Sequence, residues 1–179
     1  EKVVTLPDSY QVNDPKRQVA DKTFTRAELD LPDGGFVFCC FNNSYKITPH
    51  TFDGWMRILK QVQGSVLWLI EDNPSAVANL QLEAQRRGVN TDRLIFAKKI
   101  PLTEHLARHK AADLFLDTLP YNAHTTASDS LWAGLPVLTC SGESFASRVA
   151  ASLLTALNLP ELIAPSQADY ETLAVDLAI

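Results

Sequence analysis

The sequence predicts an α/β protein built on a Rossmann-like parallel sheet with helices on both faces. Short apolar runs alternate along its 179 residues with longer segments of helical periodicity. Within the short runs the apolar residues are continuous, which is typical of strands buried on both faces. A helix between successive strands connects parallel strands through βαβ units. These observations together predict the fold class.

Six apolar runs are predicted as strands. In chain order they are GFVFCCF (35–41), SVLWLI (65–70), RLIFAKK (93–99), DLFLDT (113–118), PVLTC (136–140) and ELIA (161–164). Since apolar residues fill these runs instead of alternating with polar ones, each strand is expected to lie between two layers of helices.

The intervals between the strands are predicted as helices. Trp55 and Leu59 lie at helical spacing in the first interval, Pro74 begins and Gly88 ends the second helix, and Thr103 is expected to cap the third. The predicted helices cover residues 51–62, 74–88, 103–112, a segment that begins near Thr125, 147–158 and 167–178.

The alternation of strands and helices sets the expected domain organisation. Residues 31–179 follow it and are expected to form one domain, with 46% hydrophobic residues in the whole chain to supply a core. Residues 1–30 do not follow it. They are polar and rich in turn residues, so we expect them to be a linker from an upstream domain.

Composition excludes several classes of protein. The chain has 16 Lys and Arg against 21 Asp and Glu, a net charge of −5, so no overall positive field would hold a nucleic acid or an anionic membrane. The three cysteines do not suggest a disulfide framework, and no apolar run approaches the ~20 residues of a membrane span. A cytoplasmic protein is expected.

Ligands of such sheets bind beyond the carboxyl ends of the strands. The seven glycines form neither G-x-G-x-x-G nor a P-loop, so the common glycine-rich phosphate cradles are missing. Polar clusters nevertheless follow three of the predicted strands: FNNSYKITP (41–49), KKIPLTEHLAR (98–108) and LPYNAHTTASD (119–129).

The third cluster predicts an anion site at a helix N-terminus. If the helix begins near Thr125, its first backbone N–H groups and the hydroxyls of Thr125 and Thr126 can donate to a phosphate, with His124 beside them. Asp129, one turn further, could accept from a ribose. Simple alternatives are that the threonines cap the helix and that Asp129 complements its dipole.

The first two clusters offer basic side chains. Lys46 could place a charge on a diphosphate, and the alternative is a solvated surface lysine. His105 and Arg108 share one helix face and could stack on and hydrogen-bond a base. Alternatively these two residues and His109 form the solvated side of the helix.

Two other chemistries are disfavoured. His105 and His109 have the spacing of a zinc-binding helix, but the glutamate of H-E-x-x-H and an obvious third ligand are lacking, so no metal site is expected. The stretch around Ser144 is similar to the nucleophile elbow of α/β-hydrolases. Those enzymes place the catalytic histidine after the serine, whereas all four histidines precede Ser144.

Several blocks resemble the C-terminal catalytic half of the O-linked N-acetylglucosamine transferases, above all their bacterial homologues. They are LPDSYQVND, FNNSYKI, NAHTTASDSLWAGLPVLT and GESFASRVAAS, and the resemblance spans nearly the whole chain. That family has the GT-B architecture of two Rossmann-like domains with a sugar nucleotide between them, usually preceded by tetratricopeptide repeats. The chain would be the second Rossmann-like domain alone, one half of a GT-B fold and inactive in isolation.

The resemblance also implies an activity and a set of site residues. The donor would be a UDP-sugar, typically UDP-N-acetylglucosamine, and the sugar would pass to a Ser or Thr hydroxyl of a protein with inversion and without a metal ion or other cofactor. Lys46 would be the catalytic residue that neutralises the departing UDP. The expected donor-binding residues are Asn43 (at a family glutamine), His105 and Arg108 (uracil), His124, Thr125 and Thr126 (diphosphate) and Asp129 (ribose side).

Other functions remain open at this point. Leu102 stands where animal members have a lysine near the nucleoside, which leaves the uridine contacts and the sugar open. An asparagine-linked protein glucosyltransferase and a nucleotide-sugar epimerase are alternatives within enzymes. A non-catalytic nucleotide-binding module is an alternative from another class. The acceptor and the general base are not indicated by the sequence.

Overall fold

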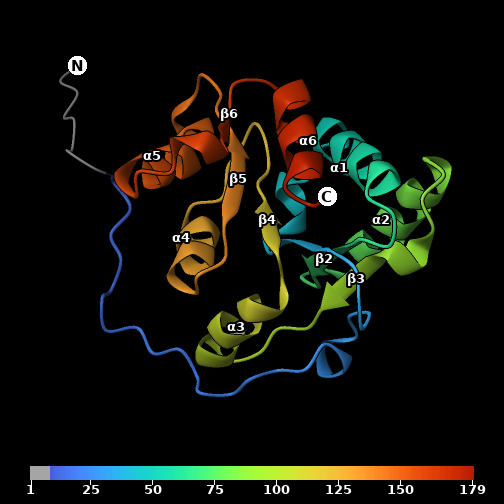
Figure 1. Ribbon diagram of the computed structural model, residues 1–179, viewed down its shortest axis with the longest axis horizontal. Coiled ribbons are helices and arrows are strands. Elements are labelled where there is room, and N and C mark those ends of the chain that lie inside the picture. Colours follow the sequence, from blue (N-terminus) through green and yellow to red (C-terminus); the bar gives the residue numbers. More distant parts are fainter. Residues whose placement is uncertain (1–8) are drawn as a thin grey trace.

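The computed structural model describes residues 9–179, and its centre is a six-stranded parallel sheet (Figure 1). The strand order is β3-β2-β1-β4-β5-β6, so the direction of winding reverses between β1 and β4. All six predicted strands are confirmed, each shorter than its apolar run: β1 (Val37–Cys40), β2 (Val66–Ile70), β3 (Leu94–Ala97), β4 (Leu114–Leu116), β5 (Val137–Cys140) and β6 (Ile163–Ala164).

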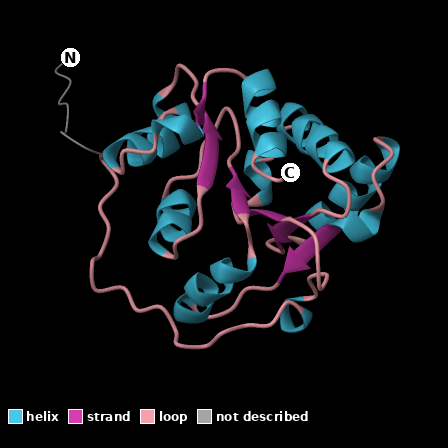
Figure 2. Ribbon diagram, viewed as in Figure 1, coloured by secondary structure: helices cyan, strands magenta, loops and turns pink. Residues whose placement is uncertain are grey.

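Helices cover both faces of the sheet, as predicted (Figures 1 and 2). They are α1 (Pro49–Gln61), α2 (Pro74–Arg86), α3 (Leu102–Arg108), α4 (Thr125–Trp132), α5 (Val149–Ala156) and α6 (Gln167–Asp176). One face carries α1, α2 and α6, and the other carries α3, α4 and α5. Single 3₁₀ turns occur at Ala27–Leu29, Ser44–Lys46, Thr91–Arg93, His109–Ala111, Phe145–Ser147 and Pro160–Leu162.

Side-chain capping explains where α1, α2 and α6 begin. Thr48, Asn73 and Ser166 each accept a backbone N–H of the first turn that follows. The prediction that Thr103 caps α3 is wrong. The helix begins at Leu102, because the carbonyl of extended Pro101 already accepts the His105 N–H at 2.8 Å.

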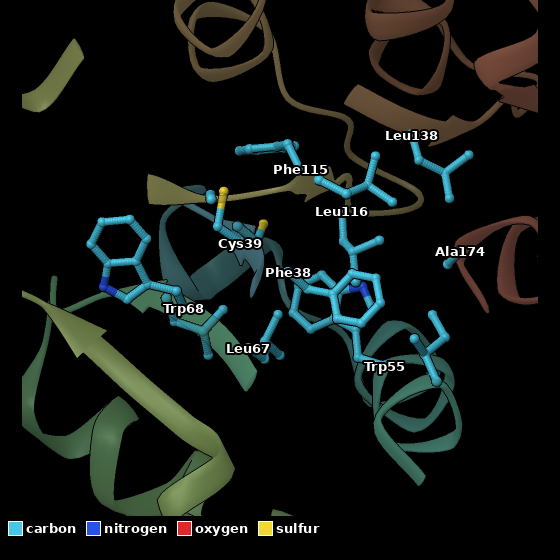
Figure 3. Close-up of a cluster of buried hydrophobic side chains, with 14 of the residues drawn as sticks. Phe38, Cys39, Trp55, Leu67, Trp68, Phe115, Leu116, Leu138 and Ala174 are labelled. Carbon is cyan, nitrogen blue, oxygen red and sulfur yellow. The ribbon is translucent and has the colours of Figure 1, made fainter. Parts of the chain in front are cut away.

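The core lies between the sheet and its two helix layers (Figure 3). Trp55 of α1 and Phe38, Leu67 and Phe115 of three adjacent strands are fully buried. All three cysteines are free and buried. The Trp55 indole donates to the hydroxyl of Tyr170 at 3.1 Å. This bond ties α1 to α6 within the helix layer on one face of the sheet.

Residues 9–30 lie against the domain, passing α5, α4 and α3 in turn (Figure 1). The Ala20 N–H donates to the carbonyl of Thr103 at 3.0 Å, and Arg26 pairs with Asp113. The interpretation of residues 1–30 as a linker from an upstream domain stays a prediction. Residues 1–8 of that linker lie outside the described residues. None of the helices in residues 9–179 combines the length and apolar character that a bilayer crossing requires.

The side chains of Arg108, at the end of α3, and of His109, which follows it, are buried, so the alternative of a solvated helix face is wrong. Arg108 and His109 are only 2% and 1% exposed. The burial comes from a long-range contact, because the Phe41 ring packs against the His109 ring with centroids 5.1 Å apart. His109 Nδ1 also donates to the His105 carbonyl at 2.7 Å. Burial lowers the pKa of His109 to about 4.

The buried histidine predicts that acid destabilises the fold. An unfolded His109 takes up a proton near its ordinary pKa of about 6.5, whereas the folded one does so only near 4, so the unfolded state binds more protons between these values. We expect its stabilising contribution to be complete above about pH 6.5 and to disappear toward pH 4. His109→Asn keeps a donor without a titrating ring.

Urea unfolding near pH 7.5 and pH 5 measures this effect. The wild-type free energy of unfolding should fall between the two pH values by about 1–3 kcal/mol more than that of His109→Asn. The other titrating groups are common to both proteins. Equal losses in the two proteins would show that His109 has the same pKa in the folded and unfolded states, which would contradict this prediction.

Candidate anion-binding site

The loops after β1 and β4 meet at the reversal of the winding and form a pocket of about 300 Å³. In open α/β sheets this point is where ligands bind. The structure brings Lys46 and the start of α4 together at this pocket. The pocket is lined by Tyr10, Gln11, Asn42, Asn43, Tyr45, Lys46, Tyr121, His124, Thr125 and Thr126.

A buried carboxyl group shapes the loop between β4 and α4. Asp117 accepts the backbone N–H groups of Thr118 and Ala123 at 2.7 and 2.6 Å and the hydroxyl of Thr139 at 2.7 Å. Burial raises the pKa of Asp117 to about 7, while these hydrogen bonds and the charge of Lys46 act to lower it. The loop is therefore closed around one side chain.

The N-terminus of α4 is open toward the pocket. His124 is the residue before the helix, and its side chain makes no capping hydrogen bond within the described residues. The first N–H groups of any helix lack partners inside it. The Thr126 hydroxyl donates across the pocket to the side-chain oxygen of Asn42, so the interpretation of the threonines as caps is wrong.

Lys46 is buried, contrary to the alternative of a solvated lysine. Its Nζ donates to the Asn122 carbonyl at 2.9 Å and lies 4.0 Å from the centroid of the Tyr121 ring. Desolvation lowers the pKa of Lys46, and the nearby Asp117 opposes this shift. Asn43, three residues after the end of β1, is exposed at the same pocket.

The His124 ring joins three segments of the chain. Its Nδ1 lies 2.6 Å from the Tyr10 hydroxyl, and its Nε2 lies 3.4 Å from the carbonyl of Ala146. Desolvation lowers the pKa of His124, the hydrogen bond to the Ala146 carbonyl opposes this shift, and the Lys46 charge adds to it. The imidazole is therefore neutral at neutral pH, with both nitrogens engaged.

The remaining predicted site residues lie outside this pocket. The Asp129 carboxylate is buried and forms an ion pair with Arg17 of the N-terminal segment. Burial raises its pKa, and the Arg17 charge opposes this. Its expected role at a ribose stays a prediction, because Asp129 does not line the pocket in this structure.

His105 and Arg108 also lie apart from Lys46. Arg108 donates to the Lys98 carbonyl at 2.7 Å, contacts His105 Nδ1 at 2.5 Å and has its guanidinium carbon 4.9 Å from the centroid of the Phe41 ring. Burial, with the Arg108 charge, lowers the pKa of His105 to about 3. Arg108 lines a second pocket, of about 210 Å³, together with Trp68 and residues of the N-terminal segment.

Sequence reasoning missed some residues of the first pocket. Asn42, Tyr45 and Tyr121 lie in the loops that were singled out, so the topological rule could have included them. Tyr10 and Gln11 come from the distant N-terminal segment, and no local pattern pointed to them. Within residues 9–179 no three His, Cys, Asp or Glu side chains gather as metal ligands would.

Comparison with known proteins gives a consistent result. The model of glycosyl transferase family 41 matches residues 13–179. The UDP-N-acetylglucosamine--peptide N-acetylglucosaminyltransferase of Caenorhabditis elegans is 42% identical to the chain over 86% of its length. The probable UDP-N-acetylglucosamine--peptide N-acetylglucosaminyltransferase SEC of Arabidopsis thaliana is 40% identical over 100% of it. The chain spans only 13% and 19% of the length of these two relatives.

A solved structure shows the same fold. A lysine-to-methionine mutant of the O-GlcNAc transferase from Thermobaculum terrenum superposes with a TM-score of 0.86 at 34% identity, covering 99% of this chain and 34% of that one. The family model covers more than half of the chain, and both curated relatives exceed 30% identity over more than two thirds of it. The chain therefore belongs to glycosyl transferase family 41.

Proposed function

We propose that this chain is the donor-binding part of a UDP-sugar-dependent protein glycosyltransferase. One observation carries the proposal: a buried lysine and an open helix N-terminus face the same pocket at the reversal of the sheet. The N-terminal end of a helix favours an anion, and a desolvated ammonium strengthens this preference. A diphosphate is the group that this pair of features suits.

In the proposed reaction the pocket stabilises UDP as it departs. Negative charge grows on the leaving diphosphate, and a preorganised ammonium with fixed N–H donors stabilises charge of that kind without reorganising. Lys46 would act as this cation, and Thr125 and Thr126 would donate through their backbone and hydroxyl groups. Such a site needs no metal ion or other cofactor.

The relatives support N-acetylglucosamine as the sugar. Both curated relatives are named as UDP-N-acetylglucosamine–peptide transferases. We propose transfer to Ser or Thr hydroxyls of a protein acceptor, with inversion. Because the chain spans a fifth or less of those relatives, we also propose an upstream Rossmann-like domain and tetratricopeptide repeats as its natural partners. The three free, buried cysteines support a cytoplasmic location.

The proposed diphosphate site makes a prediction about nucleotide affinity. UDP should bind this chain at least about tenfold more tightly than UMP, since only UDP places a second phosphate at the start of α4. Calorimetric titration of both nucleotides measures the ratio. Amide NMR during the same titration should show the Thr125 and Thr126 signals moving with UDP. Equal affinities would contradict the assignment of the pocket to a diphosphate.

The proposed role of Lys46 can be tested in a protein that joins these residues to an acceptor-binding half. Lys46→Met should lower kcat by about 100-fold or more and change donor affinity much less, because the charge on UDP is largest in the transition state. Steady-state kinetics with UDP-N-acetylglucosamine and a protein acceptor measures both quantities. Lys60→Met, on the exposed face of α1, is the matched control.

An unchanged kcat with a higher KM would give a different role to the lysine. Lys46 would then be a ligand of the bound donor and not a stabiliser of the leaving group.

A further inference from the structure

The N-terminal segment follows helix α4 side chain by side chain. Three contacts connect them beyond the Tyr10 bond to His124: the Gln11 amide lies 3.5 Å from the Thr125 hydroxyl, the Ser128 hydroxyl donates to Asn13 Oδ1 at 2.6 Å, and Arg17 pairs with Asp129. The segment, residues 10–17, thus forms a strap along the helix whose N-terminus faces the pocket.

Tyr10 is the strap residue at the pocket itself. Its ring packs edge-on against Phe145 with centroids 4.8 Å apart and against the His124 ring at 5.8 Å. Phe145 belongs to the 3₁₀ turn Phe145–Ser147, which follows β5. The Tyr10 ring is 40% exposed and has these two ring neighbours, and its hydroxyl lies at His124 Nδ1.

The hydrogen-bond roles around His124 follow from its partners. The Ala146 carbonyl can only accept, so the nitrogen that faces it, Nε2, carries the proton. Nδ1 of the neutral ring is then an acceptor, and the Tyr10 hydroxyl must donate to it. We propose that Tyr10 is a positioning residue of the diphosphate site, which fixes His124 in one orientation and one tautomer.

This arrangement affects the pocket in two ways. The Tyr10 hydroxyl donates to the Nδ1 lone pair, so this acceptor is not available to repel an anion in the pocket that both residues line. It also anchors the residue that immediately precedes α4, so the N–H groups of Thr125 and Thr126 keep their direction. Tyr10 acts on the anion through His124 and not as a catalytic residue.

The inference rests on the proposed function for its ligand, but the contact can be tested without any ligand. In ¹⁵N-detected NMR of the histidine rings, the Nδ1 resonance of His124 should carry the shift of a hydrogen-bonded acceptor. Tyr10→Phe keeps the ring and its packing and should move this resonance to the position of an unbonded nitrogen. His124→Gln assigns the signal among the four histidines.

Tyr45→Phe is the matched control. It removes a hydroxyl from the wall of the same pocket, and that ring packs against Tyr121 at 6.3 Å and not against His124. It should leave the His124 resonance where it is. An unchanged resonance in Tyr10→Phe, or an equal shift in both variants, would overturn the proposal.

Nucleotide affinity tests the consequence. Tyr10→Phe should weaken UDP about five- to tenfold and UMP less than about twofold, the effect of one lost neutral hydrogen bond. If the wild type binds UDP, and Tyr10→Phe moves the His124 resonance but leaves the affinity for UDP unchanged, the positioning role is overturned. If the wild type binds no UDP, the proposed function fails, and the shifted resonance still supports Tyr10 as the residue that positions His124.

Discussion

The geometry of the site depends on one buried carboxyl group, that of Asp117 at the end of β4. A buried carboxyl must be satisfied by hydrogen bonds, because leaving it without partners costs several kcal/mol. Thr118, Ala123 and Thr139 supply three donors, and the Tyr170 hydroxyl donates to the backbone carbonyl of Asp117 at 3.0 Å. The loop can satisfy this group only by turning back on itself, and that turn sets where α4 begins.

The same turn brings the other parts of the pocket together. The Asn122 carbonyl that accepts the Lys46 ammonium lies in it, and Asn42 bridges the two loops by donating to Thr118 at 2.8 Å and accepting from Thr126. A glycine-rich cradle lets a phosphate approach the backbone closely through small residues. Here a side-chain network fixes the open helix end instead, so the proposed anion site does not require the glycine motifs.

The strands and the two loops of the pocket could be predicted from the sequence, because both follow from patterns of neighbouring residues. Continuous apolar runs gave the six strands, and the rule that ligands bind beyond strand ends selected the loops of Lys46 and Thr126. Long-range partners could not be predicted. Arg17 lies 112 positions from Asp129, and Tyr10 lies 114 positions from His124, so no periodicity links them. The burial of Arg108 likewise depends on the Phe41 ring, just after β1, and the Trp68 ring of β2.

The central claim is that the loop closed around Asp117 presents α4 and Lys46 as one preformed diphosphate site. A crystal structure of this chain with UDP tests it most directly. The account predicts the diphosphate within hydrogen-bond distance of the Thr125 and Thr126 N–H groups and the Lys46 ammonium, with the Asp117 hydrogen bonds unchanged. A diphosphate bound elsewhere on the domain, or a loop that must rearrange around Asp117 to admit it, would contradict the account.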